Sequence, residues 1–158
     1  MKRSRVVVFG VSVIAIAAVG FYLLRAAAGP HGRPEANVTL NMVGNICHAD
    51  VSNDLGGKRG ATVMWRITNN CSTDQYVSFT GYKQYLSSGY GTIEHDVVDP
   101  DRAVTPTAIR AGQPGPPVVV RITKLVIFGE VRYKYTVCVG ADASTTGNCN
   151  DPDFDIWP

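Results

Sequence analysis

The chain has 158 residues and a formal net charge of +2, with fifteen Lys and Arg side chains against thirteen Asp and Glu. Four of the basic residues flank one hydrophobic segment near the start: Lys2, Arg3, Arg5 and Arg25. The remainder is therefore mildly acidic, which argues against a nucleic-acid partner because an acidic domain does not attract phosphate backbones. About 125 residues follow the segment, enough for one domain with a single core.

Residues 6–24 form an apolar run without a charged side chain. As a helix at about 1.5 Å per residue, such a run spans roughly 28 Å, close to the hydrocarbon thickness of a bilayer. This length predicts a membrane anchor within residues 1–28, although small residues would also allow cleavage of a signal peptide near Ala28. The basic N-terminus is expected to stay in the cytoplasm. We thus expect a single-pass cell-membrane protein with its C-terminal domain outside the cytoplasm, or a periplasmic or secreted protein after cleavage.

After the apolar run, Gly- and Pro-rich residues 29–36 predict a short stalk before a domain at 37–158. Strands are expected where apolar residues alternate or run together, and the stretch 48–60 between the first two is expected to be a long polar loop. The expected strands cover 38–42, 61–68, 75–82, 92–98, 118–128, 130–139 and 153–157.

The clearest alternation falls in 130–139, where Val131, Tyr133 and Tyr135 share one face. The run 118–128 is apolar more continuously, as expected for a central strand covered on both sides. About seven short strands with turns between them, and no helical period after residue 28, predict an all-β fold. The expected architecture is an antiparallel β-sandwich, immunoglobulin-like or cupredoxin-like, preceded by one N-terminal hydrophobic helix.

All four cysteines, Cys47, Cys71, Cys138 and Cys149, follow the hydrophobic run. An even number in an oxidising compartment predicts two disulfides, for which sequence alone allows three pairings. Cys138 and Cys149 are expected to pair across the neck of one hairpin. Cys47 then pairs with Cys71, which requires the intervening chain to return to the same end of the sheet.

Acid and base side chains occur together at His95, between Glu94 and Asp96, but neighbouring residues of a strand point to opposite faces. The sequence has no Gly-x-Ser-x-Gly or His-Glu-x-x-His motif. A type 1 copper site needs two His beside a Cys thiolate, and no His follows Cys138. We therefore expect a protein that is not an enzyme and holds no copper.

Three carboxylates alternate in the C-terminal segment, at Asp151, Asp153 and Asp155, with Phe154 and Ile156 between and after them. In a strand the three acids would face one side and repel each other unless a cation lies among them. Oxygen ligands of this kind suit Ca²⁺, which makes a calcium site one hypothesis. The alternative is a charged edge strand that discourages pairing between sheets of different molecules.

Tyr82, Tyr85 and Tyr90 lie close together in the sequence, and amphipathic aromatic side chains are favoured at recognition surfaces. They are a possible binding surface for a protein or glycan partner, with ordinary core packing as the alternative. Basic residues also recur on 118–128 and 130–139, expected as adjacent strands, while the residues after 139 carry only acids. This charge separation could be satisfied within the chain or by a second chain. The basic residues are Arg121, Lys124, Arg132 and Lys134.

Together these features predict a non-catalytic protein of the cell envelope. Residues 6–24 would tether it to the membrane, or cleavage would release it, and the sandwich would act through its surface as an interaction or assembly module. The alternative is a calcium- or carbohydrate-binding module that uses the acidic C-terminal segment or the tyrosine-rich segment. A shared fold would not decide between these functions, because sandwiches host many unrelated activities.

Overall fold

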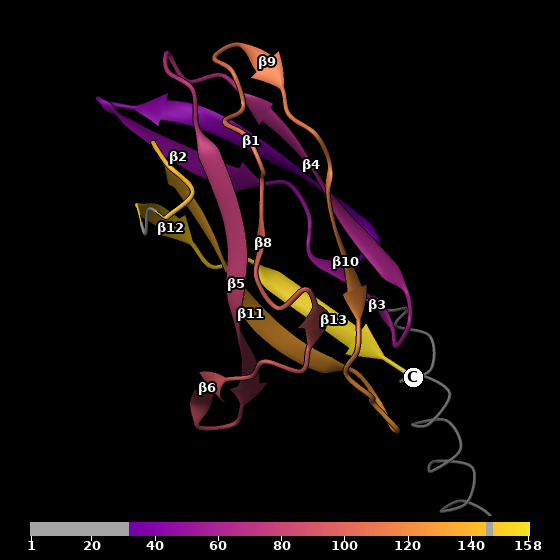
Figure 1. The fold of residues 1–158 in the computed structure, drawn as a ribbon. Helices are drawn as coiled ribbons and strands as arrows, with labels where there is room; N and C mark the ends of the chain where they lie inside the picture. The colour runs from indigo at the N-terminus through magenta and orange to yellow at the C-terminus, as the bar shows by residue number, and fades with distance from the viewer. Residues whose placement is uncertain (1–31, 145–146) are drawn as a thin grey trace, which may run out of the picture.

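The structure is a computed structural model that describes residues 32–144 and 147–158 as an all-β domain (Figure 1). Strands and no helices form the regular structure of these two ranges. Accordingly, no helix of this part of the chain is long and apolar enough to cross a membrane. The hydrophobic run 6–24 and the helix expected there lie outside the described residues.

The first of two sheets contains six strands. Their bounds are β1 Glu35–Val43, β2 Ile46–Val51, β4 Thr62–Asn69, β7 Val98–Asp99, β9 Gln113–Pro114 and β10 Val118–Ile122. The hydrogen-bonded order is β2-β1-β4-β10-β7, and β9 pairs with β4.

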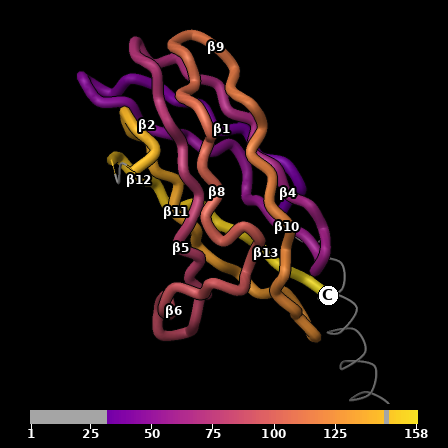
Figure 2. Tube along the Cα trace, viewed as in Figure 1, coloured from indigo at the N-terminus to yellow at the C-terminus, as the bar shows by residue number. Residues whose placement is uncertain are grey.

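The second sheet contains seven strands. Their bounds are β3 Leu55–Lys58, β5 Tyr76–Leu86, β6 Gly89–Ile93, β8 Ala103–Val104, β11 Val131–Gly140, β12 Asn148–Asn150 and β13 Asp153–Trp157. The order is β3-β13-β11-β5-β6, with β12 beside β11 and β8 beside β5. The two sheets enclose one core in a sandwich-like arrangement, and Figure 2 shows the chain passing repeatedly from one sheet to the other.

The expectation of a purely antiparallel sandwich is wrong in two places. β1 pairs in parallel with β4, and β3 pairs in parallel with β13. A parallel pair needs a connection that crosses back before the second strand begins. Here β2 and β3 supply that connection, because the chain leaves β1 through a hairpin, enters the second sheet as β3 and returns as β4.

Residues 48–60, expected to be a loop, contain most of β2 and all of β3. In β2 the buried side chains of Cys47 and Ala49 alternate with more exposed ones, as in a strand with one solvated face. In β3 the glycines are required by close packing, because a Cβ at Gly56 would overlap the carbonyl oxygen of Asp155 in β13. The glycines that made residues 48–60 resemble a loop are therefore the residues that allow β3 to lie close to β13.

Two other expected strands are shorter than predicted. The stretch 92–98 divides into the end of β6 and the start of β7, with irregular structure between them. The stretch 118–128 is a strand only as far as Ile122. Its apolar continuation does not cross the core, and β10 and β11 lie in different sheets, so the basic residues expected on adjacent strands are separated.

The two expected disulfides are present at Cys47–Cys71 and Cys138–Cys149, with Cα atoms 5.9 and 4.1 Å apart. The parallel pairing of β1 with β4 explains the first. Cys47 lies opposite Met42 near the end of β1, and Cys71 follows β4, whose Asn69 is opposite Leu40, so both cysteines are at the same end of the first sheet. Cys138 and Cys149 are directly opposite each other on β11 and β12. The 24-residue separation between Cys47 and Cys71 corresponds to about 3 kcal/mol of loop-closure stabilisation.

An aromatic cluster joins the two sheets at the centre of the core. Trp65 of β4 stacks on Phe79 of β5, with ring centroids 4.1 Å apart, and its Nε1–H donates a 3.0 Å hydrogen bond to the Tyr135 hydroxyl on β11. Tyr82 also packs on Tyr135, but its buried hydroxyl has no hydrogen-bond partner in the described structure. Burial raises the pKa of both phenols well above the usual range, so both hydroxyls stay protonated.

These two buried hydroxyls should respond differently to removal. Tyr135→Phe would leave the Trp65 N–H without an acceptor, and we expect it to lower the free energy of unfolding by about 1–3 kcal/mol. Tyr82→Phe removes an unsatisfied buried polar group and should be neutral or stabilising. Urea unfolding followed by far-UV circular dichroism would compare them, and equal losses would contradict the assigned hydrogen bond.

Candidate functional site

The structure brings together two of the three tyrosines predicted as a binding surface. Tyr85 and Tyr90 face each other across the β5–β6 hairpin with ring centroids 5.4 Å apart, edge to face. Their exposed fractions are 56% and 49%. Tyr82 is fully buried in the aromatic core, so the prediction that it belongs to the surface is wrong.

A bulge in β5 places Tyr82 in the core. Gly81 has φ +73°, and the register between β5 and β11 shifts so that Gly81 and Tyr82 both lie opposite Tyr135. One extra residue reverses the inside-outside alternation of the rest of the strand. Before the bulge Val77 and Phe79 point into the core, and after it Tyr82 does. After the bulge Tyr82 therefore points inward, and Tyr85, three residues further on, lies on the surface.

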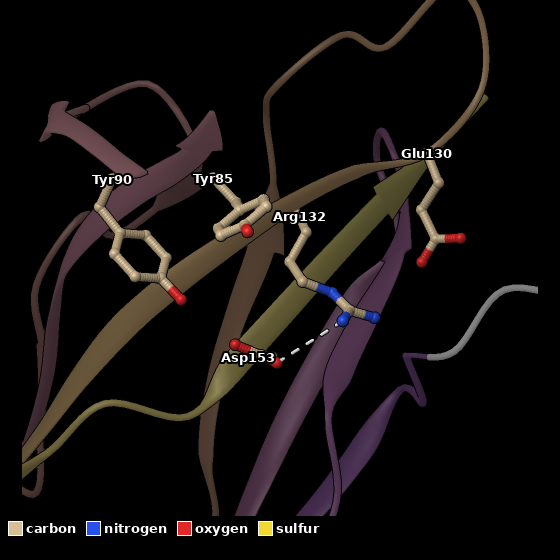
Figure 3. Close-up of a pocket in the computed structure, with 5 residues that line it drawn as sticks. All are labelled: Tyr85, Tyr90, Glu130, Arg132 and Asp153. Atoms are coloured by element: carbon tan, nitrogen blue, oxygen red, sulfur yellow. Dashed lines mark ion pairs between the residues drawn. The ribbon is translucent and has the colours of Figure 1, made fainter. Parts of the chain in front are cut away.

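Tyr85 and Tyr90 line an open pocket of ≈ 550 Å³ together with three charged residues, Glu130, Arg132 and Asp153 (Figure 3). The tyrosines come from the β5–β6 hairpin, Arg132 from β11 and Asp153 from β13, while Glu130 immediately precedes β11. The pocket thus combines two apolar ring faces with carboxylate and guanidinium groups on a rigid sheet.

The position of Arg132 in this pocket is set by Asp155. Arg132 Nε and Nη2 donate to the two carboxylate oxygens of Asp155 at 2.8 and 3.1 Å. Asp155 is fully buried, whereas the Arg132 side chain is 39% exposed. Burial raises the pKa of the Asp155 carboxyl, and the hydrogen bonds from Arg132 oppose that shift. The negative charge of Glu130 and a hydrogen bond with Glu130 raise the pKa of Asp155 further. The side-chain hydrogen bond to Asp155 raises the already high pKa of Arg132.

Lys134 and Asp153 extend the same charged cluster. Lys134 Nζ lies 2.9 Å from one oxygen of Asp153, and Arg132 Nη1 lies 3.8 Å from the other. The hydrogen bond to Asp153 raises the pKa of Lys134. Of the two possibilities for the separated charges, pairing within the chain is confirmed for these residues. Lys124 likewise pairs with Glu94 at 2.6 Å.

The three carboxylates of the calcium hypothesis therefore have different environments. Asp155 and Asp153 each contact a cation of the protein itself, and Asp151 is exposed in the segment before β13. Across residues 32–144 and 147–158, no group of three His, Cys, Asp or Glu side chains is placed to hold a metal ion. The calcium site stays a prediction, and the observed geometry favours neutralisation by Arg132 and Lys134.

The acid–base candidates are dispersed. His95 Nδ1 lies 2.7 Å from a carboxylate oxygen of Asp101, and its side chain is 75% exposed. His48, which is near Asp50 in the sequence, lies on β2, opposite Asn41 of β1. His95 thus contacts a carboxylate at the exposed surface rather than in a cleft. The hydrogen bond is with Asp101, not with a Ser or Thr hydroxyl that could act as a nucleophile.

The sequence missed the contribution of Glu130 and Arg132 to the pocket. A signal was present, because positions 130, 132 and 134 alternate on one strand as 151, 153 and 155 do on another. The basic residues at 132 and 134 and the acidic residues at 153 and 155 could have indicated that the two strands are neighbours. What the sequence did not show is that the tyrosine hairpin lies beside them.

The chain matches no protein-family model and no curated protein. Among solved structures, it is similar to a chain of the CsuC–CsuE chaperone–tip adhesion subunit complex of Csu pili from Acinetobacter baumannii, with 15% identity, a TM-score of 0.42, and coverage of 65% of this chain and 48% of that one. It is also similar to the McoA multicopper oxidase of Aquifex aeolicus, with 8% identity, a TM-score of 0.40, and coverage of 83% and 30%. This chain spans less than half of either, and likenesses this remote carry no argument about function.

Removing the cation from the buried pair should be costly. Arg132→Met would leave Asp155 buried without its cation, and we expect a loss of about 3 kcal/mol in the free energy of unfolding. Lys134→Met is the matched control, because its partner Asp153 is partly exposed, and it should cost less than about 1 kcal/mol. Urea unfolding at neutral pH measures both, and similar small losses would refute the assigned role of Asp155.

Calcium should not alter the thermal midpoint. Two protein cations already occupy the neighbourhood of Asp153 and Asp155, so a metal ion would have to displace them. Melting curves of the full-length protein with calcium and with chelator are expected to coincide. A rise with calcium would restore the acidic C-terminal segment as a metal site.

Proposed function

We propose that the protein is a non-catalytic interaction module of the cell envelope, tethered to the membrane by residues 6–24, and that it recognises a protein partner through the β5–β6 hairpin. The observation that carries the proposal is a group of exposed apolar side chains on this hairpin beside a charged pocket. Their exposed fractions lie between 41% and 56%. They are Tyr85, Leu86, Tyr90 and Ile93.

The chemistry of this surface suits protein recognition. The cores of protein–protein interfaces favour Tyr and Arg, and their rims are polar. Here the hairpin places two tyrosines next to Arg132, with the carboxylates of Glu130 and Asp153 beside them. Tyr side chains contribute large contact areas with few rotatable bonds, so little conformational entropy is lost on binding. The Asp155 hydrogen bonds hold Arg132 in place before any partner arrives.

The proposed location rests on the sequence. The length of the apolar run fits a bilayer span, the basic N-terminus fits a cytoplasmic start, and paired cysteines suit an oxidising compartment. Cleavage near Ala28 would instead give a periplasmic or secreted form of the same module.

A carbohydrate ligand is the second candidate, favoured by the concave shape of the pocket. Its volume is in the range of small-ligand sites, and tyrosine rings beside carboxylates can contact the apolar face and the hydroxyls of a sugar. In this case the ligand would contact Glu130, Arg132 and Asp153 in addition to the tyrosines. A protein partner would instead cover Leu86 and Ile93 as well.

Partner capture from native membranes tests the proposal. The double variant Tyr85→Ala/Tyr90→Ala should lose at least about tenfold in affinity for a captured protein, as expected when interface anchors are truncated. Val119→Ala is the control, because Val119 is similarly exposed but lies on β10 in the other sheet, and it should leave capture unchanged. Capture that survives the double variant would refute the proposal. Tyrosine-dependent binding of mono- and disaccharides with no protein captured would favour the carbohydrate site.

A further inference from the structure

The connection between β10 and β11 exposes an unusual amount of apolar surface. The exposed fractions are 57% for Leu125, 67% for Ile127 and 89% for Phe128, whereas Val126 between them is buried. We call residues 125–128 the apolar loop. Phe128 is the most exposed of the large hydrophobic side chains in the described part of the chain. A cluster of this kind at a loop tip marks a contact with something outside the domain.

The base of the apolar loop is firmly held. The backbone N–H groups of Thr123 and Lys124 donate to the Val97 carbonyl at 3.0 and 3.3 Å, and the Thr123 hydroxyl donates to the Asp96 carbonyl at 2.6 Å. Lys124 Nζ also lies 2.6 Å from Glu94. The side chains at the tip are thus presented by a fixed base, and Val126 alone returns to the core.

The apolar loop lies in the half of the sandwich where the described chain begins. Glu35 is level with Met64, Met64 with Val119, and β10 ends three residues later at Ile122, where the loop starts. Trp157 lies at this end too, because its neighbour Ile156 is opposite Val131, which follows the loop. The opposite end carries the β1–β2 hairpin and both disulfides.

The length of the tether favours one end of the sandwich as the end that faces the membrane. Residues 25–31 separate the apolar run from Gly32, so eight Cα–Cα steps join Leu24 to Gly32 and can span at most about 29 Å. Val43 at the opposite end is eight residues along β1 from Glu35, roughly 27 Å away. With the sandwich upright, the exposed Val43 and Ile46 of that hairpin would therefore rest on a bilayer that begins at Leu24 only if this linker were fully extended. The apolar loop can reach the bilayer without such an extension.

The surroundings of the apolar loop suit a lipid surface. Lys58 and Arg59 are exposed at the same end, together with Arg121, which lies opposite Asp99 of β7. There the β3–β4 turn meets the end of β10 through a 2.8 Å hydrogen bond from Gly60 N to the Ile122 carbonyl. Trp157, partly exposed beside Lys58, is a residue type that favours the membrane interface. Basic residues around protruding apolar side chains match anionic headgroups above acyl chains.

We propose that the apolar loop docks on the membrane that carries the tether, with Leu125, Ile127 and Phe128 at the boundary between headgroups and acyl chains. The proposal rests on the proposed tether at residues 6–24. Docking would fix the orientation of the sandwich and bring the β5–β6 hairpin close to the bilayer, because the end of β5 is level with Tyr133 near the start of β11. The partner of the hairpin would then be a protein in or at the same membrane.

Lipid quenching of tryptophan fluorescence tests the docking. Phe128→Trp is introduced into the full chain with Trp157→Phe, and the protein is reconstituted in nanodiscs of phosphatidylcholine and phosphatidylglycerol with brominated acyl chains. Ile46→Trp in the same background is the control, since Ile46 is exposed at the opposite end. We expect strong quenching at position 128, and at position 46 no more than the background from buried Trp65.

Each other result overturns the proposal in a distinguishable way. Failure of the full chain to insert, shown by its extraction from vesicles at alkaline pH, would refute the tether together with the docking. Stable insertion with equal, weak quenching at positions 128 and 46 would refute the docking alone.

Discussion

The ion pair between Arg132 and Asp155 is the interaction on which the candidate site depends. A fully buried carboxylate is tolerated in this sheet because a guanidinium donates to both of its oxygens. The pair ties β11 to β13 and determines where Arg132 enters the pocket next to Tyr85 and Tyr90. Such a pair adds little net stability over apolar packing, but breaking it is costly, so it specifies geometry more than it stabilises the fold.

The two ends of the sandwich differ in kind. One end carries both disulfides, which close it covalently. The other carries the tyrosine hairpin and the apolar loop, whose side chains are exposed at a cost that a soluble domain would ordinarily avoid. Under the proposed function, stability and recognition are thus separated along the molecule. A membrane tether that joins the domain in the half with the tyrosine hairpin and the apolar loop would make this separation useful, because it would hold both exposed surfaces near the bilayer.

The sequence predicted much of the fold but less of the site. Alternation identified the strand around Tyr133 and Tyr135, because that signal is local. The cysteines identified both disulfides, because a disulfide requires the chain to bring its two cysteines close together. The bulge at Gly81, which turns Tyr82 into the core, depends on a register that only tertiary pairing fixes. The apolar residues after Ile122 looked like a central strand because a pattern of hydrophobicity cannot distinguish burial in a core from exposure for another purpose. The pocket combines three segments whose proximity no local pattern encodes.

The most direct test of this account is a double-mutant cycle between Arg132 and Asp155. The free energies of unfolding of wild type, Arg132→Met, Asp155→Leu and the double variant would give the coupling energy between the two side chains. The account predicts a coupling of about 2 kcal/mol or more, with the double variant closer to wild type than Arg132→Met is. Additive losses, with no coupling, would show that the two residues do not act as a pair and would contradict the central claim.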